Sequence, residues 1–253
     1  MTVILEHKSG YRLGAEEKLV IEALAAAGTT FQIAALSQIY RGRVDTRHAD
    51  LVVGGMGFIK AALRQRDITM PVIDSYPAVL ESYLHRRVWQ ARLRDALSVA
   101  KAGTRVFVKP SKRPKLFSGY VLDYFNDHRA AGAPPSEPVW CSDVVSWASE
   151  WRAYVVDGSV AFLGFYEGDR ACIPDWDTVS SAVRAMSLNP GAPVSYAIDF
   201  GLISTGETAL IEVNDAFAID AYDNVPGELY LKMLKTRWDQ LVQMECSTFP
   251  SGP

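Results

Sequence analysis

The spacing of apolar residues changes near residue 76, and this change divides the chain into two parts. In the first part, short apolar runs alternate with segments in which apolar residues recur every three or four positions. This alternation predicts a small α/β unit with a parallel sheet. Its expected elements are strands 2–5, 30–35, 50–53 and 70–73 and helices 15–27 and 57–66.

The second part begins with a helical period and then reads mostly as strands joined by turns. Apolar positions from Val79 to Val88 follow the 3.6-residue period and predict a long helix over 78–100. Asp157-Gly158 suits a two-residue hairpin turn. The resulting fold class is α+β with mostly antiparallel sheets. Its other elements are strands 105–109, 119–125, 139–145, 151–156, 160–166, 194–201 and 208–213 and helices 176–186 and 227–243.

Composition excludes several classes of protein. The 253 residues are 49% hydrophobic and 22% charged with a net charge of -3, as in ordinary soluble globular proteins. This charge argues against a dedicated nucleic-acid binder. No segment approaches the ~20 apolar residues of a membrane helix, and the 3 cysteines lack the CxxC spacing of a zinc site. We expect a cytoplasmic protein with no membrane partner; the oligomeric state is left open.

The segment ALIEVN, residues 209–214, directs two polar side chains to one face of a strand. Alternate strand residues share a face, so Glu212 and Asn214 point the same way. A two-residue turn at Thr205-Gly206 would place Asp199 directly opposite Glu212, where like charges repel. A divalent cation would resolve the repulsion, and these oxygens suit magnesium or manganese. The alternative is that all three side chains are solvated at a frayed strand end.

Cations follow in the segment VFVKPSKRPKLFSGY, residues 106–120. Lys109 ends an apolar strand, and Pro110 stops the pairing directly after it. The next loop carries Lys112, Arg113 and Lys115 without an acidic residue. Such cations could stabilise phosphate charge, although a solvated turn is favoured for the first two.

Glu150 and Arg152 share one face of a later strand. They either form a surface ion pair worth under ~1 kcal/mol or contact a hydroxyl and an anion.

The order of these segments resembles the ATP-grasp superfamily, and most closely its RimK-like branch. The segments are FVKP, a basic loop, SDVV, an ExR strand, a hairpin, AIDFG and LIEVN, and the likeness covers about residues 50–222. It implies an N-terminal α/β unit, residues 1–75, followed by an ATP-grasp domain, residues 76–253. The two lobes of that domain would meet at a hinge near 142–149 and hold ATP between them.

The resemblance also implies roles for single residues. Arg152 and Lys115 would be catalytic. Arg86 or Arg87 could correspond to a further cation of the family, but a helix-surface position is favoured for both. The remaining roles are phosphate binding by Lys109 and Lys115, adenine binding by the linker Asp143, Val144 and Val145, ribose binding by Glu150, and Mg²⁺ or Mn²⁺ binding by Asp199, Glu212 and Asn214.

The implied activity is ATP-dependent ligation of a carboxylate and an amine through an acyl phosphate, with release of ADP and phosphate. The substrates would be small molecules or peptides. Two alternatives remain open. One is a nucleotide-binding regulatory or partner-binding module without turnover. The other is an ATP-grasp enzyme that modifies nucleic acid, prompted by arginines 86, 87, 92 and 94, although a solvated surface is favoured for them.

Overall fold

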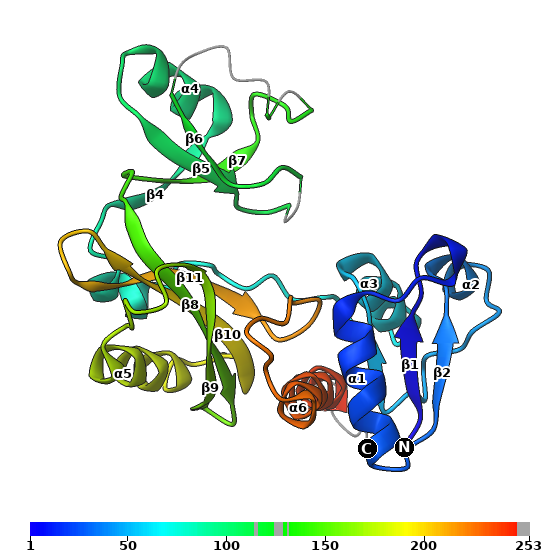
Figure 1. Ribbon diagram of the computed structural model, residues 1–253. Coiled ribbons are helices and arrows are strands. Elements are labelled where there is room, and N and C mark those ends of the chain that lie inside the picture. Colours follow the sequence, from blue (N-terminus) through cyan, green and yellow to red (C-terminus); the bar gives the residue numbers. More distant parts are fainter. Residues whose placement is uncertain (114–115, 124–128, 131, 247–253) are drawn as a thin grey trace, which may run out of the picture.

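The chain forms three sheets that follow one another along the sequence (Figure 1). The computed structural model describes residues 1–113, 116–123, 129, 130 and 132–246, with side chains up to residue 243. The N-terminal sheet and the two later sheets carry separate sets of helices. This arrangement confirms the predicted fold class, in which an α/β unit precedes an α+β region with mostly antiparallel strands.

The N-terminal unit is a three-stranded parallel sheet in the order β2-β1-β3. Residues Val3 to Leu5 of its middle strand are almost fully buried, as expected for a parallel strand covered on both faces. The elements are β1 (Val3–Glu6), η1 (Ser9–Tyr11), α1 (Ala15–Ala26), β2 (Phe31–Ala34), α2 (Leu36–Tyr40), β3 (Leu51–Val53) and α3 (Met56–Gln65).

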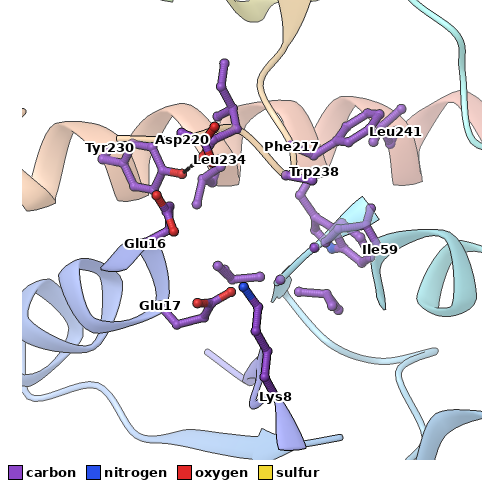
Figure 2. Close-up of a pocket in the computed structure, with 16 residues that line it drawn as sticks. Lys8, Glu16, Glu17, Ile59, Phe217, Asp220, Tyr230, Leu234, Trp238 and Leu241 are labelled. Atoms are coloured by element: carbon purple, nitrogen blue, oxygen red, sulfur yellow. Dashed lines mark hydrogen bonds between the residues drawn. The ribbon is translucent and has the colours of Figure 1, made fainter. Parts of the chain in front are cut away.

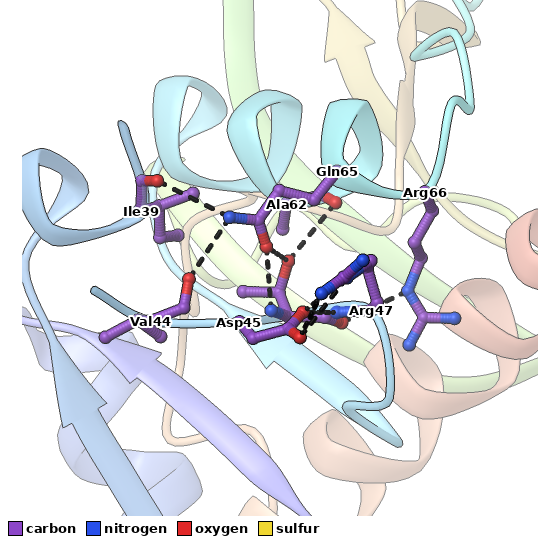
Figure 3. Close-up of polar contacts among 8 residues, drawn as sticks. Ile39, Val44, Asp45, Arg47, Ala62, Gln65 and Arg66 are labelled. Atoms are coloured by element: carbon purple, nitrogen blue, oxygen red, sulfur yellow. Dashed lines mark hydrogen bonds and ion pairs between the residues drawn. The ribbon is translucent and has the colours of Figure 1, made fainter. Parts of the chain in front are cut away.

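A buried polar network holds the connection between α2 and β3 in place (Figure 3). The backbone amide and the hydroxyl of Thr46 both donate to Oε1 of Gln65 at 2.8 Å. Gln65 in turn donates its amide to the carbonyl of Val44 at 3.1 Å. Buried polar groups require such partners, so this network keeps the loop against α3.

The second sheet has the order β4-β7-β5-β6 with antiparallel neighbours, and α4 packs on it. In Figure 1 it lies well away from the N-terminal unit. Leu93 of α4, Val108 and Val139 are buried in its core. We call this sheet with α4 the lid lobe. Its elements are β4 (Val88–Arg92), α4 (Leu93–Lys101), β5 (Val106–Pro110), β6 (Tyr120–Leu122) and β7 (Pro138–Ser142).

The third sheet, in the order β11-β10-β8-β9, is antiparallel throughout. Asp157 and Gly158 form the predicted two-residue turn, with φ values of 52° and 73°. Val156 pairs with Ser159 across it. We call this part the base lobe. Its elements are β8 (Trp147–Val156), β9 (Ser159–Gly168), α5 (Trp176–Ser187), β10 (Ser195–Ile203), β11 (Thr208–Asp215) and α6 (Gly227–Cys246).

Helix α6 joins the base lobe to the N-terminal unit. One buried core contains Ile4 of β1, Tyr154 of β8 and Trp238 of α6. The indole Nε1 of Trp238 also donates to the carbonyl of Ala49 at 3.3 Å. These contacts give the N-terminal unit a fixed position beside the base lobe. Among the described helices, none is long and apolar enough to cross a membrane.

Two predicted elements are wrong. Residues 70–73 are not a strand but irregular chain. The long helix over 78–100 is replaced by the short 3-10 helix η2 (Ala78–Tyr83), strand β4 and helix α4. His85, with φ 48°, takes a left-handed conformation between η2 and β4. The apolar spacing fits a helix locally, but pairing of β4 with β7 prevails over this local preference.

Candidate active site

The predicted pairing of Asp199 with Glu212 is observed, but the turn leading to it differs from the prediction. The hairpin loop has three residues, 204–206, with Gly206 at φ 97°. Pairing near the turn is therefore displaced by one residue. A β-bulge at Ile211 shifts the register back by one. Two differences of one residue thus cancel, and the two carboxylates lie opposite each other.

The bulge also changes which apolar residues of β11 face the core. Leu210 and Val213, three residues apart, belong to the buried core, whereas Ile211 is only partly buried. The expectation that Ile211 would share a face with Val213 assumed strict alternation, which a bulge interrupts.

Arg86 occupies this edge of the sheet. It donates to the carbonyls of Leu210 at 2.6 Å and Ile211 at 3.1 Å, and it stacks on Trp147 with 5.1 Å to the ring centroid. The predicted helix-surface position of Arg86 is wrong, because the residue lies outside any helix and is largely buried. Burial lowers its pKa, although nearby acidic groups oppose that effect.

A row of charged side chains crosses three strands of the base lobe. Arg152 on β8 pairs with Asp199 on β10, which pairs with Glu212 on β11. Nε and Nη2 of Arg152 each donate to a different oxygen of Asp199 at 2.7 Å. The amide of Asn214 bridges both carboxylates, at 3.1 Å to Asp199 and 2.9 Å to Glu212. The three predicted oxygen-bearing side chains therefore converge.

Lys109 reaches this row from the other sheet. It lies on β5 of the lid lobe, and its Nζ donates to Glu212. The same ammonium lies 4.6 Å from the ring centroid of Tyr76. The contact joins residues 103 positions apart and links the two lobes directly. We call Lys109, Arg152, Asp199, Glu212 and Asn214 the charged cluster.

Opposite charges compensate for burial within the charged cluster. Burial disfavours the ionised form of Glu212, but Lys109 outweighs this effect and lowers the pKa of Glu212. Burial would likewise lower the pKa of Arg152, yet Asp199 raises it. Burial raises the pKa of Asp199, and Arg152 opposes that rise. An anionic ligand and a divalent cation would therefore enter a site that already holds charges of both signs.

Glu150 lies two residues before Arg152 on β8. Burial, together with repulsion from Glu167, Asp199 and Glu212, raises its pKa from the ordinary 4.5 to about 7. Such a carboxyl is poised between its protonated and ionised forms near neutral pH. The predicted surface ion pair between Glu150 and Arg152 is not the contact observed, because the guanidinium is directed at Asp199.

Replacing Glu150 by glutamine should change the pH dependence of stability. Between pH 4.5 and about 7 the unfolded carboxyl is ionised and the folded one protonated, so wild-type stability falls as pH rises. The variant has no such loss. Its gain over wild type should be near zero below pH 4.5 and reach the order of 2 kcal/mol above pH 7. Urea unfolding at pH 5, 6 and 8 measures this difference, and a gain that does not vary with pH would contradict it.

The remaining predicted residues lie at or near the junction of the lobes. Asp143, Val144 and Val145 form the connection from β7 to β8. Asp143 accepts from the guanidinium of Arg87 at 2.8 Å, which lowers the pKa of the carboxyl. Arg87 is thus an exposed partner of this linker. Lys115 lies outside the described residues, so its predicted catalytic and phosphate-binding roles stay predictions.

The donor set suits a hard divalent cation that shares its coordination with another ligand. Among the residues the structure describes, no group of three or more His, Cys, Asp and Glu forms a metal cluster. The charged cluster offers two carboxylates and one amide, and hard oxygens of this kind bind magnesium. Magnesium usually completes its coordination with substrate phosphates and water. Asp199, Glu212 and Asn214 therefore fit a metal–nucleotide complex better than a metal held by protein alone.

Comparison with known sequences identifies the class of protein. Residues 83–233, more than half of the chain, match a family described as an ATP-grasp domain, family 2 of its clade. The chain belongs to this ATP-grasp family, which confirms the resemblance seen in the sequence. No curated protein matches the chain.

Solved ATP-grasp structures share the fold over nearly the whole chain. D-cycloserine synthetase DcsG has a TM-score of 0.60 at 14% identity, with 95% of this chain and 100% of that chain covered. A RimK domain protein from Sphaerobacter thermophilus has a TM-score of 0.50 at 15% identity, with 92% and 99% covered. The ligase PsnB, complexed with precursor peptide PsnA2 and AMPPNP, has a TM-score of 0.54 at 14% identity, with 96% of both chains covered. At such identities these similarities establish the fold.

Proposed function

We propose that the protein is an ATP-dependent ligase that joins a carboxylate to an amine. The observation that carries the proposal is the charged cluster, which brings Lys109 of the lid lobe onto Glu212 of the base lobe, beside Asp199 and Asn214. Similar folds include a synthetase of a small molecule and a ligase complexed with a precursor peptide. Either kind of substrate is compatible with the proposal.

Each residue of the charged cluster has a task in this reaction. Lys109 would move its ammonium from Glu212 to the phosphates of ATP, since both are anions within reach of one side chain. Arg152, held by Asp199, would present its remaining N–H groups to the substrate carboxylate or the transferred phosphoryl group. Asp199, Glu212 and Asn214 would hold magnesium, which supplies charge neutralisation and bridges phosphate oxygens. Glu150 would accept a hydrogen bond from the ribose.

The proposed chemistry needs no covalent bond to the protein. A carboxylate oxygen of the first substrate attacks the γ-phosphorus, and the bond to ADP breaks. The neutral amine of the second substrate then attacks the acyl carbon, phosphate leaves, and the amine loses a proton as the amide forms. The protein contributes positioning and preorganised charges. Cys141 takes no part, because burial raises the pKa of its thiol to about 12.

Product release in the presence of paired substrates tests this proposal. Purified protein with ATP and Mg²⁺ should release ADP and phosphate when a panel of acids and amines includes the correct pair, and the product should contain a new amide. If ATP binds but no acid–amine pair releases ADP, the alternative of a nucleotide-binding module without turnover is favoured instead. Mass spectrometry of the reaction mixture distinguishes ligation from simple ATP hydrolysis.

A further inference from the structure

A second site lies at the junction of the N-terminal unit and the base lobe, outside the charged cluster (Figure 2). It is a pocket of about 90 Å³ between α1, the start of α3, the loop after β11, and α6. Ile59, Phe217 and Trp238 contribute apolar walls. At roughly 30 Å³ per water molecule, the enclosed part accommodates a group of a few heavy atoms.

Glu17 is the polar group for which this pocket has no internal partner. The residue is only 5% exposed, and within the described part of the chain its Oε2 atom has no hydrogen-bond partner. Burial raises the pKa of Glu17, although backbone groups and Lys8 oppose the rise. An unpaired buried carboxylate is costly, so a ligand that supplied a donor here would gain a strong interaction.

The charges around Glu17 favour a cation. Glu16 and Asp220 also line the pocket, with Lys8 as the basic lining residue. In Figure 2 the Lys8 ammonium points toward Glu17 from the facing wall. Three carboxyl groups against one ammonium leave an excess of negative charge, which attracts cationic ligands.

One loop connects this pocket to the charged cluster. Asp220 lines the pocket, and its carbonyl accepts from Nη1 of Arg152 at 3.1 Å. The neighbouring Ala221 amide donates to Glu16 at 3.3 Å. A molecule seated on Glu17 is therefore one loop away from the guanidinium that would face the reacting groups.

We propose that this pocket binds the amine-bearing substrate and that Glu17 recognises its primary ammonium group, with a short apolar body against Ile59 and Trp238. The assignment rests on the proposed ligase function for the meaning of the ligand. The binding site itself can be tested without nucleotide.

Three probes of similar size and different charge test the site: propylamine, propionamide and propionate. Each is titrated into the intact protein without ATP, and binding is followed by NMR. Wild type should bind the cationic propylamine at least about 10-fold more tightly than the neutral amide, and propionate least. Glu17→Gln should lose this preference, whereas Glu17→Asp, which keeps the charge, should retain part of it. Glu22→Gln, on an exposed position of the same helix, is the matched control and should bind like wild type.

The outcomes separate the pocket from the ligase proposal. Equal binding of propylamine and propionamide to wild type, or equal propylamine binding by wild type and Glu17→Gln, overturns the pocket assignment. Neither result affects ADP release by paired substrates. Conversely, a cation preference that depends on Glu17 supports the pocket even if no acid–amine pair releases ADP.

Discussion

Replacing Glu212 by glutamine should lower magnesium-dependent ATP turnover by about 100-fold or more. The substitution removes one of two carboxylates that would hold the cation, but the glutamine oxygen can still accept from Lys109, so the fold should persist. Steady-state release of ADP, measured over a range of Mg²⁺ concentrations, shows the effect. The concentration of Mg²⁺ needed for half-maximal rate should rise as the maximal rate falls.

Glu207→Gln is the control for this variant, because Glu207 lies at the exposed turn of the same hairpin. It removes the same charge about one strand length away and should leave turnover and its Mg²⁺ dependence unchanged. Wild-type turnover by Glu212→Gln would remove this residue from the cation site.

Replacing Arg152 by lysine should lower turnover by about 100-fold and cost about 2 kcal/mol of stability. Lysine keeps the charge but cannot donate to both oxygens of Asp199 at once, as Arg152 does at 2.7 Å. The N–H group that reaches the carbonyl of Asp220 would also be lost. Turnover assays combined with urea unfolding measure both effects.

A second buried ion pair provides a control for the loss of stability. Arg237 on α6 donates to both oxygens of Asp215 at 2.7 Å, with exposures of 7% and 6% for the two side chains. Arg237→Lys should therefore cost a similar amount of stability while leaving turnover close to wild type. If both lysine variants lose turnover equally, Arg152 acts only through stability, and its role at the reacting groups is refuted.

Local chemistry made the hairpins the most predictable part of the fold. Asp157-Gly158 was identified because both residues tolerate positive φ, and they adopt it. At the Asp199–Glu212 hairpin, local rules gave the correct pair by an incorrect route. The longer loop and the bulge at Ile211 compensate for each other, and no single residue in that segment signals either of them.

Long-range contacts account for what the sequence did not reveal. Val88 to Arg92 has the spacing of a helix, but it becomes a strand because β7, some fifty residues later, pairs with it. Arg86 is buried because the carbonyls of Leu210 and Ile211, 124 and 125 positions away, require donors. The pocket around Glu17 likewise depends on α6 packing against α1, a contact without a local signature.

The charged cluster is expected to bind a cation together with the phosphates of ATP, and the proposed activity depends on this. A crystal structure with a non-hydrolysable ATP analogue and Mg²⁺ tests it most directly. It should show an ion in contact with oxygens of Asp199, Glu212 and Asn214, and Lys109 Nζ bonded to a phosphate oxygen instead of Glu212. A nucleotide bound elsewhere, with Lys109 still on Glu212 and no ion between the carboxylates, would contradict it.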